Sequence, residues 1–313
     1  MTDDPDAARD ATVALCSVSQ RFGRRLALDR LSIAVPRGHV VGLLGPNGAG
    51  KTTVISIAAG LQRPAGGSVS WKGAPLPFPF PAAVRARIGL VAQETALYDE
   101  LTAAENLRFA AALFGVDKAR SAEVLELVGL TDRAKDRVGT LSGGQRRRLA
   151  FGRALVHDPD LLVLDEPTLA VDIDNRHAIW GHVRRLRQQG KAVLLSTNYL
   201  DEAEALCDTV VALRDGREVV AGPAAEVLGS SGRCVEIDCA DDAVGAVRTS
   251  IERLAPGARV EVHAAGLTVH LGTSSAADQV ASVALGTGVV RGVRLRSPDM
   301  LEVLDTLDAG ARA

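Results

Sequence analysis

Apolar and polar positions change their spacing along the first 230 residues in a way that predicts strands and helices in turn. Strand-like runs are found at 13–19, 31–36 and 39–45, and the last continues directly into a glycine-rich turn. From about 96 to 160, apolar residues recur at intervals of three and four, which predicts helices. Strand character returns at 160–167. The pattern favours an α/β fold.

Clear local signals lie between 175 and 222. A helix over 175–190 is expected to bury Ile179, Val183 and Leu186 and to stop at Gly190, whereas Arg184, Arg185 and Arg187 are expected on its solvated face rather than in a basic patch. The strand that follows ends in Ser196-Thr197-Asn198, and a β-hairpin comes next with its turn at Asp215-Gly216. Earlier in the chain, prolines at 75, 77, 79 and 81 exclude helix and central strand and predict an exposed loop.

The composition changes at 229–233, which predicts a linker to a second domain. Beyond it the pattern predicts a strand at 234–239, a helix at 242–254 and two strands at 259–264 and 267–271. A helix at 275–284, a strand at 289–296 and a last helix at 298–308 follow. The order β-α-β-β-α-β matches a split βαβ, ferredoxin-like α+β domain. The expected organisation is a loose N-terminus at 1–10, a first domain at 11–230 and an accessory or dimerisation domain at 233–313. We expect no carboxylate pair, histidine cluster or phosphate loop in the second domain.

Composition narrows the class of protein. The 313 residues are 47% hydrophobic and 24% charged, and the net charge of −2 gives no basic excess, so no nucleic-acid partner is expected. The four cysteines, Cys16, Cys207, Cys234 and Cys239, form no CxxC pair and no zinc pattern, which favours reduced thiols in a cytosolic protein. The acidic N-terminus has no signal-peptide pattern, and no apolar run approaches the roughly 20 residues of a membrane span. We expect a soluble protein, or one attached to a membrane only through a partner.

The turn after 39–45 carries the strongest chemical signal. The segment GPNGAGKTT fits the phosphate-loop pattern G-x-x-x-x-G-K-[ST] at every fixed position, after a strand and before a helix. Glycines let backbone N–H groups curl around a β-phosphate, Lys51 is expected to reach the β- and γ-phosphates, and the Thr52 hydroxyl to bind Mg²⁺. The residues expected to bind nucleotide here are Gly45, Pro46, Asn47, Gly48, Ala49, Gly50, Lys51, Thr52 and Thr53.

A second element supplies carboxylates. In LLVLDEP, four apolar residues are followed by Asp165 and Glu166 at the strand tip. Acidic residues rarely end a core strand without a partner. We therefore expect Asp165 to bind Mg²⁺ through water and Glu166 to act as the general base on the attacking water.

Between these elements lies LSGGQRRRLAFGRAL, residues 141–155. Together with the phosphate loop and LLVLDEP it resembles the ATP-binding cassette (ABC) ATPase family over about residues 12–228. Ser142 is expected to cap a helix whose N-terminus presents donors and a positive dipole. The resemblance implies that Ser142, Gly143, Gly144 and Gln145 face an ATP held by a second cassette. Arg146–Arg148 are expected on the solvated face of this helix.

The resemblance places other residues around ATP and its Mg²⁺. Phe22 stands where an aromatic side chain stacks on adenine, although it could instead be a core residue. Gln93 matches the glutamine that touches Mg²⁺ and the attacking water. The residues from Gln93 to Asn106 would line the groove for a coupling helix of a membrane permease. The implied fold is a P-loop NTPase with a RecA-like core, an antiparallel β subdomain and a helical subdomain at about 95–160.

Two positions depart from the family pattern. After DEPT the usual Ser-Gly/Ala-Leu-Asp is here Leu169-Ala170-Val171-Asp172. The change alters the contact surface across the dimer but keeps the aspartate, and the resemblance implies that Asp172 is among the nucleotide-binding residues. Asn198 stands where members usually carry a histidine that faces the γ-phosphate. An amide donates and accepts hydrogen bonds but neither carries charge nor relays a proton. One hypothesis is slower hydrolysis with Asn198 still sensing the phosphate, and the alternative is that Asn198 merely fills the site.

Within the family, two stretches resemble the ATPase subunits of bacterial ABC-2-type exporters: residues 94–116 and 195–222. That resemblance implies an ATPase that powers export of a drug, antibiotic, lipid or polysaccharide. It also implies a second cassette, in a homodimer, and a peripheral location on the inner face of the cell membrane. The alternatives are a low-turnover regulatory subunit and a non-transport ATPase acting on ribosomes or DNA.

Overall fold

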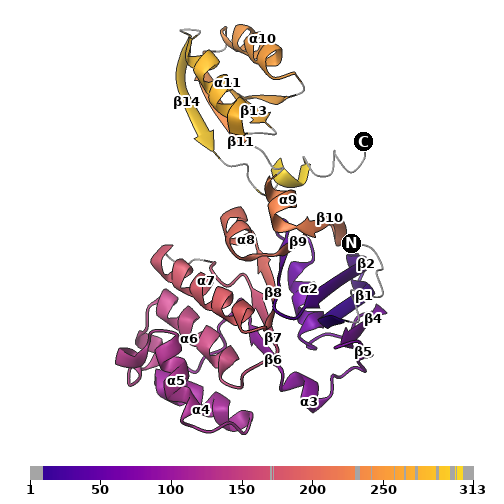
Figure 1. Ribbon diagram of the computed structural model, residues 1–313, viewed down its shortest axis with the longest axis vertical. Coiled ribbons are helices and arrows are strands. Elements are labelled where there is room, and N and C mark those ends of the chain that lie inside the picture. Colours follow the sequence, from indigo (N-terminus) through magenta and orange to yellow (C-terminus); the bar gives the residue numbers. More distant parts are fainter. Residues whose placement is uncertain are drawn as a thin grey trace. The chain divides into compact units, whose positions relative to one another are not determined.

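The computed structural model describes residues 10–169, 171, 173–229, 233–240, 242–256, 258–263, 266–271, 274–286, 289–296, 300 and 302–305. The chain forms two compact units, Met1–Ala224 and Ala225–Ala313 (Figure 1). The prediction for residues 1–9 and the role given to Asp172 lie outside the described residues. No helix in the described ranges is long and apolar enough to cross a membrane.

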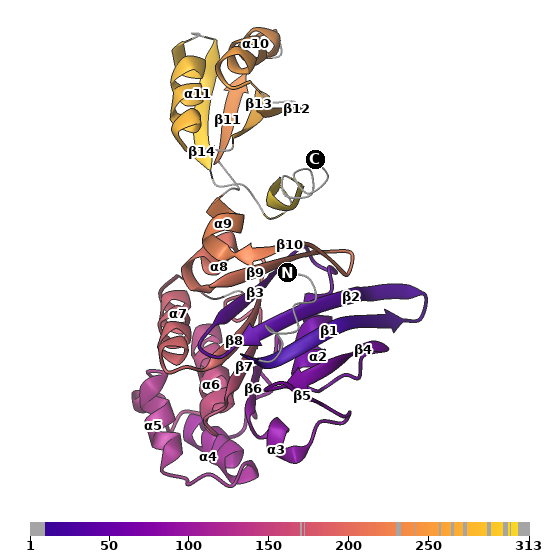
Figure 2. The same cartoon turned by 45° about the vertical axis from the view of Figure 1, so that its right-hand side comes forward.

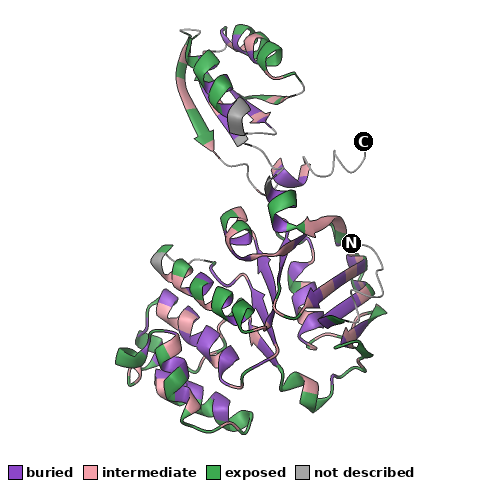
Figure 3. Cartoon of the chain, in the orientation of Figure 1, coloured by how far each residue is buried: buried purple, intermediate pink, exposed green. Residues whose placement is uncertain are grey.

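A six-stranded sheet forms the centre of the first unit. Its strand order is β10-β9-β3-β8-β7-β6, with bounds Arg217–Pro223, Thr209–Arg214, Val40–Leu44, Ala192–Thr197, Leu161–Asp165 and Ile88–Val91. All neighbours are parallel except β9 and β10. Every residue of β3, β7 and β8 is buried (Figure 3), as expected of parallel strands whose two faces are both covered.

The parallel strands bring the predicted chemistry to one edge. The carboxyl end of β3 leads into the phosphate loop, β7 ends at Asp165, and Asn198 directly follows β8. Open α/β sheets bind ligands in the crevice outside the carboxyl ends of their strands. The sheet topology therefore gathers segments that are more than 100 residues apart in sequence.

A second, antiparallel sheet has the order β2-β1-β4-β5, with bounds Arg25–Pro36, Ala11–Phe22, Gly66–Trp71 and Ala74–Pro75. One apolar core joins it to the central sheet through α2 (Lys51–Ala58) (Figure 2). The predicted antiparallel β subdomain is thus present. Its first two strands are longer than predicted, and the added parts combine exposed residues at the hairpin end with buried residues such as Ala11 and Leu28. Around the proline-rich loop, Phe80 is buried, and α3 (Ala82–Arg85) is a single exposed turn.

The helical part contains α4 (Ala103–Leu113), α5 (Arg120–Leu127), the 3-10 turns Thr131–Arg133 and Val138–Thr140, and α6 (Gly143–Leu155). A capping box starts α4 at Thr102 and Glu105, and a second starts α6 at Ser142 and Gln145. The predicted cap at Ser142 is therefore confirmed. Figure 1 shows α4, α5 and α6 gathered on the side of the sheet that carries β6 and β7.

After β7 the chain forms α7 (Ile173–Gln188) and, beyond β8, α8 (Leu200–Leu206). Ile179, Val183 and Leu186 are buried, as predicted. The predicted hairpin turn also forms, with φ of 50° at Asp215 and 76° at Gly216. This turn is bonded to two other segments, because Gly216 N donates to Ala49 O (3.0 Å) and Asp29 N donates to Gly216 O (2.9 Å).

The second unit begins within α9 (Ala224–Gly229) and contains an antiparallel sheet of order β12-β13-β11-β14, with bounds Arg259–His263, Gly266–Leu271, Arg233–Cys239 and Val290–Arg296. Helices α10 (Val244–Leu254) and α11 (Ser274–Gly286) share one apolar core with it, which includes Val235 and Ile237. Because side chains alternate along a strand, Cys234 and Glu236 point to the other face. Of the predicted last helix, Met300 and residues 302–305 are described, and these are helical.

Candidate functional site

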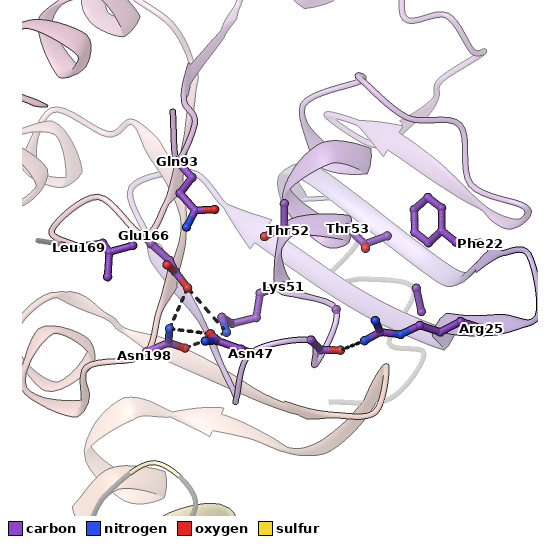
Figure 4. A pocket seen from close by; sticks show the side chains of 13 residues that line it. Phe22, Arg25, Asn47, Lys51, Thr52, Thr53, Gln93, Glu166, Leu169 and Asn198 are labelled. Atoms are coloured by element: carbon purple, nitrogen blue, oxygen red, sulfur yellow. Dashed lines mark hydrogen bonds and ion pairs between the residues drawn. The ribbon is translucent and has the colours of Figure 1, made fainter. Parts of the chain in front are cut away.

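A pocket of about 550 Å³ lies at the carboxyl edge of the central sheet (Figure 4). Its lining combines the phosphate loop, the strand tips and one end of the antiparallel sheet, and includes Phe22, Arg25, Ala27, Asn47, Gly48, Gly50, Lys51, Thr52, Thr53, Gln93, Glu166, Leu169 and Asn198. Most of the nucleotide-binding residues predicted from the phosphate loop therefore meet in one place with Gln93, Glu166 and Asn198.

Two glycines are required by the shape of the phosphate loop. Gly45 has φ 151°, and a Cβ there would lie 2.4 Å from Leu213 O. Gly50, the N-cap of α2, has φ 109°, and its Cβ would lie 2.7 Å from Ala27 O. Both conformations and both close approaches exclude a side chain. Of the other predicted loop residues, Ala49 is buried, and the Pro46 carbonyl accepts a hydrogen bond from Lys51.

Lys51 is a buried cation whose charge is only partly compensated by neighbouring acceptors and carboxylates. Its side chain is 5% exposed, and its Nζ donates to Gly45 O (2.7 Å), Pro46 O (3.2 Å) and Asn198 Oδ1 (2.8 Å). The Glu166 carboxylate lies 4.0 Å from Nζ. Burial lowers the pKa of Lys51, and the charges of Glu166 and Asp165 oppose that shift. A phosphate group would supply the anion that such a buried ammonium lacks.

The carboxylates of β7 are held by the neighbouring strand. Ser196 Oγ donates to Asp165 Oδ1 at 2.6 Å, and Glu166 N donates to Ser196 Oγ (3.0 Å) and Ser196 O (3.1 Å). Glu166 has φ 46°, in the left-handed region that residues other than glycine rarely adopt. The turn that presents Glu166 to the pocket is thus a strained conformation with several fixed contacts.

Asn198 joins three groups of the pocket. Its Oδ1 accepts from Lys51, while its Nδ2 donates to Glu166 Oε1 (2.8 Å) and Asn47 Oδ1 (3.2 Å) (Figure 4). Since an ammonium only donates and a carboxylate only accepts, this orientation of the amide is the one that satisfies both neighbours. The polar side chain after β8 therefore faces the ligand pocket.

The oxygen donors predicted for Mg²⁺ fit that metal in kind. Thr52 and Gln93 line the pocket, whereas Asp165 is 4% exposed, does not line the pocket and has one oxygen bonded to Ser196. Hydroxyl, amide and carboxylate oxygens are the ligands that Mg²⁺ takes, and it usually keeps several waters. Because Asp165 does not line the pocket, a contact through water suits it better than a direct one.

Phe22 stands at the far end of the pocket from Glu166 (Figure 4). It is 51% exposed, so the alternative that it is a core residue is wrong. Beside it, Arg25 Nη2 donates to Gly48 O at 2.8 Å. Sequence reasoning missed Arg25, because no motif marks it; the hairpin between β1 and β2 brings it to the phosphate loop.

The signature residues occupy a different surface. Ser142, Gly143, Gly144 and Gln145 do not line the described pocket. Ser142 and Gly143 are exposed, and a Cβ on Gly143 would meet no atom within 4 Å. Their role against a nucleotide held by a second cassette stays a prediction.

Arg147 contradicts the expectation of a solvated face for Arg146–Arg148. Its residue is 6% exposed, and its guanidinium donates to five carbonyl groups, those of Ala92, Gln93, Asp165, Glu166 and Pro167, at 2.7–3.0 Å. Burial lowers its pKa, and the charges of Asp165, Glu202 and Glu166 oppose that shift. The five-donor fork of arginine suits this cage of carbonyls.

The neighbours of Arg147 differ from it. Arg146 pairs with Asp99 (2.8 Å), and Arg148 donates to the carbonyls of Val128 and Gly129 within the helical part. Periodicity marks position 147 as one face of α6, since Gly144 and Phe151 are also buried there. The spacing of Gly144, Arg147 and Phe151 could have predicted that Arg147 is buried. The prediction failed because arginine was assumed to be solvated.

Comparisons with known proteins agree with this geometry. Residues 28–169 match a family model described as ABC transporter. The chain is 39% identical over 255 residues to the Nod factor export ATP-binding protein I of Cupriavidus pinatubonensis (strain JMP 134 / LMG 1197), covering 80% of this chain and 78% of the relative. It is 39% identical over 220 residues to a linearmycin resistance ATP-binding protein of Bacillus subtilis (strain 168), covering 69% and 70%.

A solved structure has the same fold as the first unit. A dimeric ATP-binding cassette in a post-hydrolysis state, bound to ADP and Pi, superposes with a TM-score of 0.63 at 28% sequence identity. The match covers 68% of this chain and 98% of that chain.

Substituting Arg147 tests whether it positions the turn that presents Glu166 to the pocket, called the catalytic turn below. We expect Arg147→Met to lower the kcat of ATP hydrolysis by roughly 100-fold, because small misplacements of reacting groups have effects of that size. The affinity for ATP should change little, since Arg147 does not line the pocket. Arg147→Lys should restore part of the rate by keeping a donor. Steady-state kinetics and equilibrium nucleotide binding separate the two effects.

Arg148→Met is the matched control, because it removes a guanidinium bonded to two carbonyls of the same helical part. Loss of the Arg148 guanidinium should lower the melting temperature. It should leave kcat within about threefold of the wild-type value, since Arg148 is bonded to no part of the catalytic turn. Equal kcat values for the two methionine variants, measured where both are folded, would show that Arg147 has only a structural role.

Proposed function

Because the chain belongs to the ABC transporter family and is an ATP-hydrolysing member of it, we propose that it powers the export of a small molecule, drug or lipid through a separate membrane permease. The relatives at 39% identity, one a Nod factor export protein and the other a linearmycin resistance protein, support an export role. The observation that carries the enzymatic part is the meeting of Lys51, Glu166 and Asn198 in one pocket. As a peripheral subunit, the protein would lie on the inner face of a bacterial cell membrane.

The residues have distinct roles in hydrolysis. Lys51 and the phosphate-loop N–H groups bind the β- and γ-phosphates, and Phe22 stacks on adenine. Glu166 accepts a proton from the attacking water, which Gln93 helps to orient. Lys51 stabilises the charge that develops on the transferred phosphoryl group. Mg²⁺, held by Thr52, Gln93 and Asp165, would neutralise charge on the phosphate oxygens.

A second cassette completes the site in this proposal. The N-terminus of α6 presents backbone donors and a positive dipole at an exposed surface, and Gly143 leaves room for a close approach. In the proposed homodimer, Ser142–Gln145 of each chain contact the ATP bound by the other. Leu169, 40% exposed, and Asp172 belong to the contact surface between the cassettes. The second unit, with its split βαβ order, is proposed to assist dimerisation or regulation.

A groove on the helical part is the proposed docking site for the permease. It has a volume of about 270 Å³ and lies between α4, α6 and β6, with Tyr98, Phe109, Leu113, Phe114 and His157 among its lining. Phe109 and Leu113 are 43% and 69% exposed. An exposed apolar groove of this kind suits an amphipathic helix from a partner. It contains Asn106, the end of the segment for which a coupling-helix contact is implied.

Glu166→Gln tests the assignment of the base. We expect turnover to fall by roughly 100-fold or more, because the amide cannot accept the proton of water. ATP should then hold the variant as a dimer, which size-exclusion chromatography with light scattering measures. Adding Lys51→Ala to this variant should abolish ATP binding and the dimer together. If Glu166→Gln turned over ATP at the wild-type rate, the assignment of Glu166 as the base and the proposed mechanism of hydrolysis would both be wrong.

Asn198→His tests whether the amide slows hydrolysis. A neutral imidazole can accept from Lys51 and donate to Glu166 as the amide does, and can also carry a proton. We expect kcat to rise by roughly tenfold, less than a full acid–base effect of about 100-fold or more, because Glu166 already acts as the base. Asn198→Ala, which loses all three contacts, is the control for simple occupancy. An unchanged rate in Asn198→His would leave Asn198 as a residue that fills the site.

Phe109→Glu tests the groove. A charge there should prevent seating of an apolar helix, so the fraction of the protein that sediments with membranes of its host should fall severalfold. ATP binding should be unchanged, because the groove and the nucleotide pocket share no lining residue. Leu61→Glu is the matched control, at an apolar side chain that is 65% exposed and outside the groove. Equal loss in both variants, or in neither, would argue against this docking site.

A further inference from the structure

The second unit contains a cluster of metal-ligating side chains that the sequence analysis did not expect. Cys234 lies on β11, His270 on β13, and Glu302 in the helical residues 302–305. Their ligand atoms all lie within 4.8 Å of one another. No sequence motif marks this group, because the three residues come from separate elements and form no CxxC or HxxxH pattern.

We propose that Cys234, His270 and Glu302 form a binding site for Zn²⁺. The Cys234 Sγ lies 3.4 Å from His270 Nδ1 and 3.8 Å from Glu302 Oε2, and His270 Nδ1 lies 3.9 Å from Glu302 Oε1. Ligands of a tetrahedral zinc ion, at their usual bond lengths, are separated by roughly 3.3–3.6 Å. Small side-chain rotations would therefore let all three groups reach one ion.

The donor set selects the class of metal. Thiolate and imidazole suit Zn²⁺, whereas Mg²⁺ and Ca²⁺ take oxygen ligands, and the carboxylate disfavours Cu(I). Cys234 is 1% exposed, and the side chains of His270 and Glu302 are 11% and 16% exposed. Three protein ligands leave a fourth position open to water or another ligand.

A carboxylate beside the cluster matches the usual outer partner of a zinc-bound histidine. His270 Nε2 has no hydrogen-bond partner within the described part of the chain, and Glu261 Oε2 lies 3.6 Å from it. When Nδ1 binds a metal, Nε2 carries the proton and turns to such a carboxylate. This pair would fix the ring tautomer and orientation.

Arg296 is the strongest objection to a cation here. It donates to both oxygens of Glu302 at 2.6 Å and to Glu236 Oε1 at 2.6 Å. Each carboxylate oxygen has two lone pairs, and the fork of Arg296 uses only one on each oxygen. Two further carboxylates near the cluster, Glu236 and Glu261, are themselves paired with Arg294 (3.6 Å) and Arg259 (2.7 Å), so they add little net negative charge. Arg296 thus orients the ligand and lowers the zinc affinity without blocking the site.

The test uses the full untagged chain, stripped of metal by a chelator and kept in excess Mg²⁺. Titration with Zn²⁺ against a chromophoric chelator should give about one bound ion per wild-type chain. Each of the variants Cys234→Ser, His270→Ala and Glu302→Gln should raise the Kd for Zn²⁺ by at least about 100-fold. Glu261→Gln, which leaves all three ligands, should raise it by about tenfold. Co²⁺ in place of Zn²⁺ should give thiolate-to-metal charge-transfer absorption in the wild type and none in Cys234→Ser.

Matched controls come from the same sheet. Cys239→Ser changes another buried cysteine of β11, and His263→Ala another histidine, on β12, so both should keep the wild-type zinc affinity. Zn²⁺ should also raise the melting temperature of the wild type and not of Cys234→Ser, because binding stabilises only the folded site. Equal zinc affinity in wild type and Cys234→Ser, or equal loss in Cys239→Ser, would leave the cluster as a hydrogen-bonded network without metal.

Discussion

The need to compensate the buried ammonium of Lys51 organises the nucleotide pocket. A charge with 5% exposure must be surrounded by acceptors, and the chain supplies them from three segments that are distant in sequence. Two are carbonyls of the phosphate loop, and the others are the Asn198 amide and the more distant Glu166 carboxylate. These acceptors lie where the phosphates of ATP would bind. The residues proposed to act in catalysis are therefore also those that compensate the buried cation.

The turn at Glu166 depends on a second buried cation. Glu166 adopts a left-handed conformation, which costs free energy unless surrounding contacts stabilise it. Ser196 bonds its N–H, and Arg147 bonds its carbonyl and those of both neighbours. Because the same guanidinium also bonds the carbonyls of Ala92 and Gln93, it ties α6 to the Glu166 turn and to the backbone of Gln93. The helix that carries the signature residues thus cannot move without affecting the geometry of Glu166.

Much of this arrangement could be predicted, and the reason lies in how far each signal extends along the chain. The phosphate loop, the Ser142 cap and the Asp215-Gly216 turn are fixed by residues within a few positions of one another, and all three form as predicted. The prediction of a solvated Arg147 is wrong, because its partners are backbone carbonyls 18 to 55 positions away. Every residue has a backbone carbonyl, so the sequence does not show which ones would bind Arg147. The cluster of Cys234, His270 and Glu302 was missed for the same reason. Strand pairing between β11 and β13 places Cys234 opposite His270, and a pattern along one strand cannot show this.

The two hydrogen bonds of Gly216 give the chain a short mechanical connection. Through Ala49 O they hold the phosphate loop, and through Asp29 N they hold β2, which lines the adenine end of the pocket. The same hairpin continues along β10 to Pro223, after which α9 leads into the second unit. If nucleotide shifts Ala49, the hairpin must follow or lose its bond. The strand that leads to the C-terminal unit therefore begins at a turn that is hydrogen-bonded to the phosphate loop, where a triphosphate is proposed to bind.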